Sequence, residues 1–211
     1  YWDVPATPDQ VLLRRAGTPP QLAEAMRTGD TQVAAVHVPA TARAQLNAIP
    51  GVSTGISVQP RVLEFTLNTR SATAADPRVR AGLLSLLDPN LLASVGTGGR
   101  SDVEPARAMI LAPSDPGYVP TAPARLSLPD ALGQLIAAGY VIPPPPTQAG
   151  QPISPITKDG KPFTLRIGAP VGDDIATTVA STATDQLRAL GIEATVVKLA
   201  PEELFGTALA R

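Results

Sequence analysis

The sequence contains no cysteine, one histidine and few aromatic residues: one Trp, three Tyr and three Phe among 211 positions. Without cysteine there are no disulfides, thiolate nucleophiles or thiolate metal sites. The absence of cysteine does not indicate the cellular compartment, because exported proteins often lack cysteine too. The single histidine, His37, has no second histidine with which to share a metal ion, and its apolar neighbours predict a packed core side chain. We therefore expect no metal ion and no cofactor.

Charge of one sign and long apolar runs are also missing. The 17 basic and 18 acidic residues give a net charge of -1 and do not cluster, so nothing favours binding to nucleic acid or to an anionic membrane surface. No apolar run approaches the roughly 18 residues that suggest a membrane span. The chain starts at Tyr1 without methionine or a signal peptide. We expect a piece of a longer protein, with any export signal or lipid anchor outside it.

Proline and glycine are abundant, with 24 and 17 residues, and we expect this excess to lie in loops. Two long surface loops are predicted, over about residues 100–127 and 143–160, the second beginning with a short polyproline run. The content of hydrophobic residues, 44%, is that of an ordinary globular protein. At this length the chain can bury a sizeable core in one large domain or two small ones.

The chain is organised around residues 61–99. Residues 61–68 alternate in the manner of a strand with one apolar and one polar face. The apolar positions are Leu63, Phe65 and Leu67, and the polar ones are Glu64, Thr66 and Asn68. Asp76-Pro77 and Asp88-Pro89 each predict an N-cap followed by a proline at the first helical position, which opens two helices. A half-polar strand backed by a helix pair would present its polar face to a ligand or partner.

Helices and strands also alternate on both sides of this segment. Strands are predicted at residues 11–15, 32–38, 56–58, 163–167 and 192–199, and helices from Thr18 to Gly29, at 40–49, from Leu128 to 138, and for about 17 residues from Asp173 or Asp174. The strand at 32–38 is too continuously apolar to be half-exposed, which predicts burial on both faces. Asp159-Gly160 predicts a hairpin turn. This order favours an α/β or α+β layer, with a parallel crossover near the end of the chain.

Motifs that could carry catalysis or nucleotide binding stand in the wrong context. Residues 51–55 match G-x-S-x-G, but a predicted helix precedes the serine, a strand follows it, and the only histidine lies upstream. Residues 96–99 follow a helix and lack the lysine of a phosphate loop. Asp173 and Asp174 are explained by helix capping, with contact to a ligand as the alternative. We predict no catalytic residue and a protein that is not an enzyme.

Glu64, Thr66 and Asn68 remain as candidate binding residues. On spacing alone, a solvated strand face explains them better than the wall of a binding cleft does.

Several segments, read in order, resemble one lobe of the family 5 extracellular solute-binding proteins, which include oligopeptide and dipeptide receptors. They are Tyr1-Trp2, residues 27–30, Leu67-Asn68, residues 76–81, 86–88 and 138–140, Asp159-Gly160 and residues 186–192. The resemblance implies an α/β lobe, with a mixed sheet flanked by helices, of a type II periplasmic-binding-protein-like two-lobed fold. It implies that residues 1–211 form a single ligand-binding lobe, and that Glu64, Thr66 and Asn68 face the cleft between lobes near the loop at 168–174.

Three further segments, residues 29–34, 60–62 with 65–67, and 113–120, resemble a mycobacterial lipoprotein branch of this family. This resemblance implies a monomeric, extracytoplasmic protein, anchored in the cell envelope by an N-terminal lipid. The implied role is in phosphatidylinositol mannoside and lipoarabinomannan synthesis, through binding a mannosylated glycolipid or a pathway enzyme. Such a ligand would need carboxylate and amide partners for its hydroxyls, for which Glu64 and Asn68 are candidates, and an arginine near phosphate, either Arg61 or Arg70.

Departures from the family pattern leave two other functions open. Gln32 stands where transport members usually carry aspartate, and the polar strand lacks the tyrosines of many peptide receptors. One alternative is an oligopeptide receptor that delivers its ligand to the permease of an ABC importer. The other is a scaffold that binds an envelope enzyme and no small molecule, which the scarcity of aromatic side chains for stacking favours.

Overall fold

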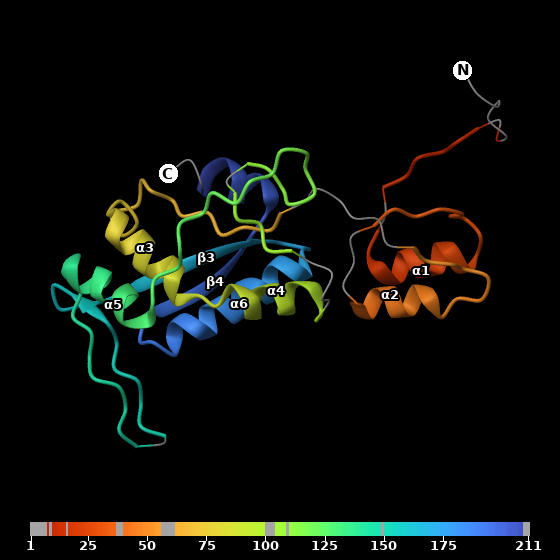
Figure 1. Cartoon of the computed structure of the whole chain (residues 1–211). Coiled ribbons are helices and arrows are strands. Elements are labelled where there is room, and N and C mark those ends of the chain that lie inside the picture. Colours follow the sequence, from red (N-terminus) through yellow and green to blue (C-terminus); the bar gives the residue numbers. More distant parts are fainter. Residues whose placement is uncertain are drawn as a thin grey trace. The chain divides into compact units, whose positions relative to one another are not determined.

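The structure is a computed structural model. It describes residues 8, 10–15, 17–36, 40–55, 62–99, 104–108, 110–148 and 150–208. The chain divides into two compact units, Tyr1–Ser57 and Val58–Arg211, shown in Figure 1.

The first unit contains two helices, α1 (Pro19–Arg27) and α2 (Ala40–Asn47), both as predicted. Thr18 and Gln21 form a capping box at the start of α1, and Gly29, at φ 82°, follows its end. A small apolar cluster joins the two helices: Leu22, Ala23, Leu46 and Ile49.

The strands predicted in this unit are wrong for the residues that the structure describes. Residues 11–15 are exposed and 32–36 contain no strand, with the side chain of Val33 88% exposed. A strand requires a neighbouring strand for its backbone hydrogen bonds, and no described segment of this unit supplies one. An apolar run in the sequence was therefore not enough to form a strand in this unit. His37, Val38 and residues 56–58 lie outside the described residues.

The second unit begins with the predicted helix pair, α3 (Pro77–Leu86) and α4 (Pro89–Thr97). The Asp76 carboxylate accepts a hydrogen bond from the Arg78 backbone N–H at 2.9 Å, and Asp88 accepts one from Asn90 at 2.9 Å. Both aspartates are N-caps in front of proline, as the sequence predicts. Residues 98–127, which follow α4, contain no helix or strand in their described part.

Helix α5 (Leu128–Ala137) packs closely against α3. A Cβ placed on Gly82 of α3 would lie 2.8 Å from the Ala131 carbonyl oxygen, so glycine is what permits this approach. Two cations bind carbonyls at the end of α5: the Arg78 guanidinium contacts Ala137 O at 2.6 Å and Lys158 Nζ contacts Ala138 O at 2.8 Å. Positive charge at a helix C-terminus stabilises the helix dipole.

The last part of the unit contains the sheets. Strands β1 (Thr157–Lys158) and β2 (Lys161–Pro162) form the predicted hairpin, with Asp159 and Gly160 both at positive φ, as a type I′ turn requires. Strand β3 (Thr164–Pro170), helix α6 (Asp174–Arg188) and strand β4 (Glu193–Leu199) form the crossover unit, with β3 and β4 parallel. Among the described residues, neither β3 nor β4 pairs with a third strand.

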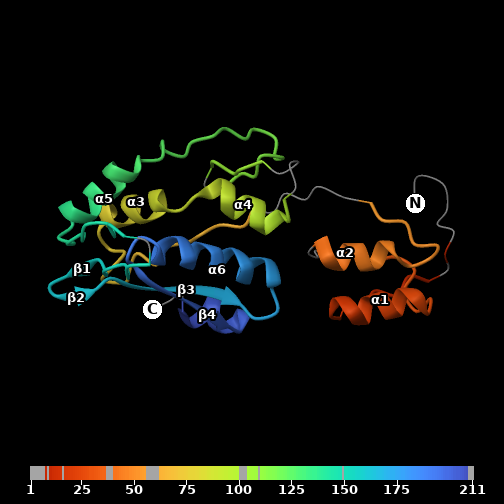
Figure 2. The same ribbon diagram turned by 90° about the horizontal axis from the view of Figure 1, so that it is seen from below.

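Helices cover one face of the β3–β4 sheet. Figure 2 shows α6 between the sheet and α4. Ile167, Ala169 and Ala194 point to this side and are buried in the main core. The π-helix η1 (Glu203–Ala208) contacts β3, where Leu204 approaches Gly168 so closely that a Cβ there would lie 2.7 Å from the leucine side chain. The architecture is mixed helix and sheet, as expected.

The Asp76–Arg78 pair predicts a dependence of stability on pH. Hydrogen bonds from the Arg78 guanidinium, together with its backbone N–H, lower the pKa of the Asp76 carboxyl from 3.8 to about 2. Because the folded pKa is depressed, the pair's stabilisation is present above pH 3.8 and is lost as pH falls towards 2. We expect Asp76→Asn, which keeps a capping oxygen, to melt below wild type at pH 5, with the gap closing by pH 2. Thermal unfolding followed by circular dichroism measures this, and a constant gap would contradict it.

Candidate ligand-binding surface

Residues 62–68, predicted as a half-polar strand, are not a strand in the structure. Their backbone pairs with no described strand. The apolar and polar residues therefore alternate in sequence without the strand-to-strand hydrogen bonds of a sheet. The two faces separate only in part as predicted, because Leu63, expected on the apolar face, is 57% exposed. Phe65 and Leu67 pack against the main core, whereas Glu64 and Thr66 are exposed and Asn68 is half-buried.

The polar side chains of this segment make local contacts. Thr66 Oγ1 donates to Glu64 Oε1 at 3.3 Å. Asn68 Oδ1 accepts from the Arg70 backbone N–H at 3.0 Å, which forms the turn that leads towards α3. The Arg70 side chain is exposed, and Arg61 lies outside the described residues. Glu64 and Thr66 therefore remain available on the surface, while Asn68 has a structural task as well.

Asp173 is the N-cap of α6, since its carboxylate accepts from the Ala176 backbone N–H at 2.8 Å. Asp174 is the first residue of the helix, is exposed, and interacts favourably with the positive end of the helix dipole. The capping interpretation of this pair is confirmed, and contact with a ligand stays a prediction.

A hollow of about 240 Å³ brings Glu64 together with the loop between α4 and α5. It is lined by Val62, Glu64, Ala108, Ile110, Leu111, Ala112 and Asp115. The Asp115 carboxylate accepts from the Ala112 backbone N–H at 2.7 Å. The sequence marks residues 114–117 only as a turn, and no spacing relates Asp115 to Glu64. Sequence reasoning therefore missed Asp115 as a candidate site residue.

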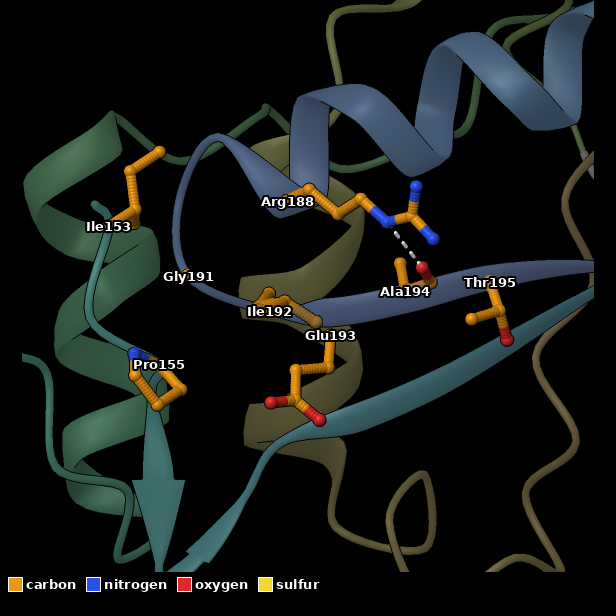
Figure 3. Close-up of a pocket in the computed structure, with 8 residues that line it drawn as sticks. All are labelled: Ile153, Pro155, Arg188, Gly191, Ile192, Glu193, Ala194 and Thr195. Atoms are coloured by element: carbon orange, nitrogen blue, oxygen red, sulfur yellow. Dashed lines mark hydrogen bonds between the residues drawn. The ribbon is translucent and has the colours of Figure 1, made fainter. Parts of the chain in front are cut away.

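A larger hollow, of about 310 Å³, lies beside the start of β4 and contains none of the predicted site residues (Figure 3). Arg188 and Glu193 extend to opposite sides of the strand, and Ile153 and Pro155 lie on the connector across from it. Arg188 Nε donates to the Ala194 carbonyl oxygen at 2.7 Å. This hydrogen bond gives the arginine a structural role at the strand's outer edge.

The remaining motifs have structural explanations. Gly98, in the left-handed conformation, is the C-cap of α4, so residues 96–99 cap a helix as predicted. Ser53 follows α2 in a segment without strand or helix, which is not the setting of a nucleophile elbow. The described ranges hold no group of three or more His, Asp or Glu residues arranged to bind a metal ion. No helix in this part of the chain has the length and apolar character needed to cross a bilayer.

The sequence profile of the bacterial extracellular solute-binding proteins, family 5, middle region, matches residues 1–210. The chain belongs to this family. The family resemblance inferred from short motifs is thus confirmed over almost the whole length, and membership of an extracellular family implies a place in the cell envelope.

LpqW of Mycobacterium tuberculosis, from strains CDC 1551 and H37Rv, is 44% identical to the chain over 227 residues. It bears the name "Probable monoacyl phosphatidylinositol tetramannoside-binding protein". The alignment covers 99% of this chain and 36% of the relative, so the chain spans about a third of the length of the curated relatives it matches.

Solved structures give the same fold class. The match to the periplasmic EDTA-binding protein EppA covers 87% of this chain and 34% of the EppA chain, with a TM-score of 0.64 and 20% sequence identity. The match to the oligopeptide-binding protein AppA of Bacillus subtilis, in complex with a nonapeptide, covers 89% of this chain and 36% of the AppA chain, with a TM-score of 0.59 and 18% sequence identity. These likenesses concern the fold alone. They confirm the predicted α/β fold of the family 5 binding proteins, and the assignment of residues 1–211 to a single lobe stays a prediction.

Proposed function

We propose that this chain supplies one ligand-binding lobe of a two-lobed, non-enzymatic solute-binding lipoprotein of the cell envelope. Its ligand would be a mannosylated phosphatidylinositol, and its role would lie in phosphatidylinositol mannoside and lipoarabinomannan synthesis. One observation carries the proposal: 44% identity, over 99% of the chain, to a protein whose name specifies a phosphatidylinositol tetramannoside as ligand. Anchoring through an N-terminal lipid is part of the same proposal.

Binding would work by closure of the two lobes around the ligand. The polar surface of this lobe forms one wall, and contacts made only in the closed state shift the population towards it. Glu64 and Thr66, both exposed, would bind hydroxyl groups, and the amide nitrogen of Asn68 would donate to them. Arg70 would contact the phosphate, because a guanidinium matches phosphate oxygens in geometry and charge. Asp173 and Asp174, at the start of α6, are the residues through which the 168–174 loop would contact the ligand.

A peptide receptor of an ABC importer is the second candidate, since the family includes peptide-binding proteins such as AppA. A scaffold for an envelope enzyme is the third, and the sparse aromatic content is what favours it.

Native mass spectrometry of the full-length, lipid-free protein distinguishes the three functions. The protein is exposed to an envelope lipid extract and, separately, to a mixture of peptides. We expect a retained mass equal to that of a phosphatidylinositol mannoside. Retained peptides would replace this function with the transport receptor, and an empty protein in both samples would favour the scaffold.

Replacing Glu64 and Asn68 by alanine tests the polar surface. We expect the double variant to bind phosphatidylinositol tetramannoside at least about tenfold more weakly, because a hydrogen bond to a charged group contributes about 1.5–3 kcal/mol. The double variant should stay folded but melt somewhat below wild type, because Glu64 is exposed whereas Asn68→Ala removes the turn hydrogen bond from the Arg70 backbone N–H, which contributes about 0.5–1.5 kcal/mol. Unchanged affinity would refute the assignment of these residues.

A further inference from the structure

We infer that Asp115 is a second ligand-contacting residue of this surface, and that Glu64 and Asp115 together bind the hydroxyl groups of a single sugar ring in the hollow of about 240 Å³. This inference rests on the proposed function and adds a residue and a subsite to it. The loop between α4 and α5 then forms part of the binding wall.

The loop that carries Asp115 is closed at its base by hydrogen bonds. The Arg107 carbonyl oxygen accepts from the backbone N–H groups of Thr121 at 2.7 Å and Ala122 at 2.8 Å. The Arg107 backbone N–H donates to Tyr118 Oη at 2.7 Å. Asp115 itself is fixed by the hydrogen bond from Ala112. The carboxylate is thus positioned before a ligand arrives, which reduces the entropy lost on binding.

The two carboxylates of the hollow have acceptor capacity to spare. Glu64 accepts one long hydrogen bond, from Thr66, and Asp115 accepts one, from Ala112. Neither carboxylate forms an ion pair with any residue that the structure describes. Each keeps a carboxylate oxygen with no hydrogen bond from the described residues. An ionised carboxylate only accepts, so the hollow is suited to a ligand with several donors, such as adjacent hydroxyl groups.

Apolar side chains complete the hollow beside the carboxylates. Ile110 is 91% exposed and Val62 is 45% exposed, although both are large and aliphatic. A sugar ring offers hydroxyl groups at its edge and C–H groups on its faces, which matches carboxylates and aliphatic side chains placed side by side. The volume lies below the roughly 300–1,000 Å³ of a site for a drug-sized ligand. The hollow therefore suits one ring of a larger glycan.

The same features make a calcium site a poorer match. Ca²⁺ takes about 6–8 oxygen ligands, whereas the side chains that line the hollow supply two carboxylates and otherwise aliphatic groups.

Charge removal without change of shape tests the inference. Full-length, lipid-free protein is titrated with the water-soluble glycan released from phosphatidylinositol tetramannoside by deacylation, and affinity is measured by calorimetry. Asp115→Asn keeps an oxygen that can accept from Ala112, so the loop is preserved. We expect Asp115→Asn and Glu64→Gln each to weaken binding about tenfold or more. Asp185→Asn, an exposed acid on α6 outside the hollow, is the matched control and should bind like wild type.

The outcomes separate the two proposals. If wild type binds the glycan and Asp115→Asn binds equally well, the inference is overturned while the proposed function stands. If wild type binds no glycan, both are overturned. A parallel titration with CaCl₂ adds a third comparison: tight Ca²⁺ binding that Asp115→Asn abolishes would replace the sugar subsite with a cation site. Unfolding curves of all variants should coincide, and an early transition in Asp115→Asn alone would show that its role is to hold the loop.

Discussion

Leu135→Ala should lower the free energy of unfolding by about 2–5 kcal/mol, which is the range for removing a fully buried leucine side chain. Leu135 is 0% exposed at the centre of the α3–α5 contact, beside Gly82 and Ala131. The close approach of the two helices limits how far the neighbours can move into the space left behind, so we expect a value in the upper half of the range. Urea denaturation measures the change through a lower midpoint at an unchanged slope.

Ile136→Ala is the matched control for this prediction. Ile136 is the next residue of the same helix, is also a large aliphatic side chain, and is 57% exposed. Because alanine has the higher helix propensity, we expect Ile136→Ala to change stability by no more than about 0.5 kcal/mol. Equal losses for the two variants would mean that the α3–α5 contact does not stabilise the second unit.

Gly191→Ala should be the second most damaging change, for two reasons that add. Gly191 has a φ of 87°, a conformation that costs a residue with a Cβ about 1–3 kcal/mol. A Cβ at this position would also lie 2.5 Å from the Ser154 carbonyl oxygen, well inside contact distance. The connector before β1 is held here, because the Ile156 N–H donates to the Gly191 carbonyl oxygen at 2.8 Å. We expect the total loss to exceed the conformational cost alone.

Gly172→Ala separates the two reasons. Gly172 has nearly the same φ, 83°, and a Cβ there would have no atom within 4 Å. It should therefore carry the conformational cost only. Chemical denaturation of both variants gives the difference, which measures the clash with Ser154, and a difference of zero would show that the connector moves aside freely.

The helices and the hairpin could be predicted from sequence because their determinants are local. Asp76 and Asp88 each stand directly before a proline, and an aspartate that accepts from a nearby backbone N–H needs nothing from the rest of the chain. Asp159-Gly160 likewise adopts positive φ at both turn positions. The β3–α6–β4 crossover followed from two apolar runs with one capped helix between them.

Strands were predicted at residues 11–15, 32–36 and 62–68 and are absent there, because a strand depends on a pairing partner that periodicity does not reveal. Val33 and its neighbours have the composition of a buried strand, yet Val33 is 88% exposed. For residues 62–68, alternation correctly predicted that Phe65 and Leu67 pack against the core, but Leu63 is 57% exposed and the expected strand pairing is absent from the described residues. Amphipathic alternation thus predicted the orientation of two of the three apolar side chains and did not predict the hydrogen bonding of the backbone.

The candidate site likewise contains one residue that the sequence could suggest and one that it could not. Glu64 could be identified from its place on a polar face, and its family resemblance supported the choice. Asp115 could not, since it reaches the hollow through the path of a loop that has no periodicity. Hydrogen bonds at Arg107 close this loop, and Asp115, which lies within the closed part, lines the same hollow as Glu64.

Both outer edges of the β3–β4 sheet lack a pairing strand among the described residues, which bears on how this chain behaves in concentrated solution. Unpaired strand edges are templates for association with other chains, and proteins limit this with charged side chains along the edge. On β4, Lys198 is exposed, and Arg188 covers the Ala194 carbonyl group with its own N–H. Arg188 and Lys198 thus supply the kind of charged side chains that limit association through a strand edge. We expect a chain that lacks both to self-associate through β4 before its helices unfold.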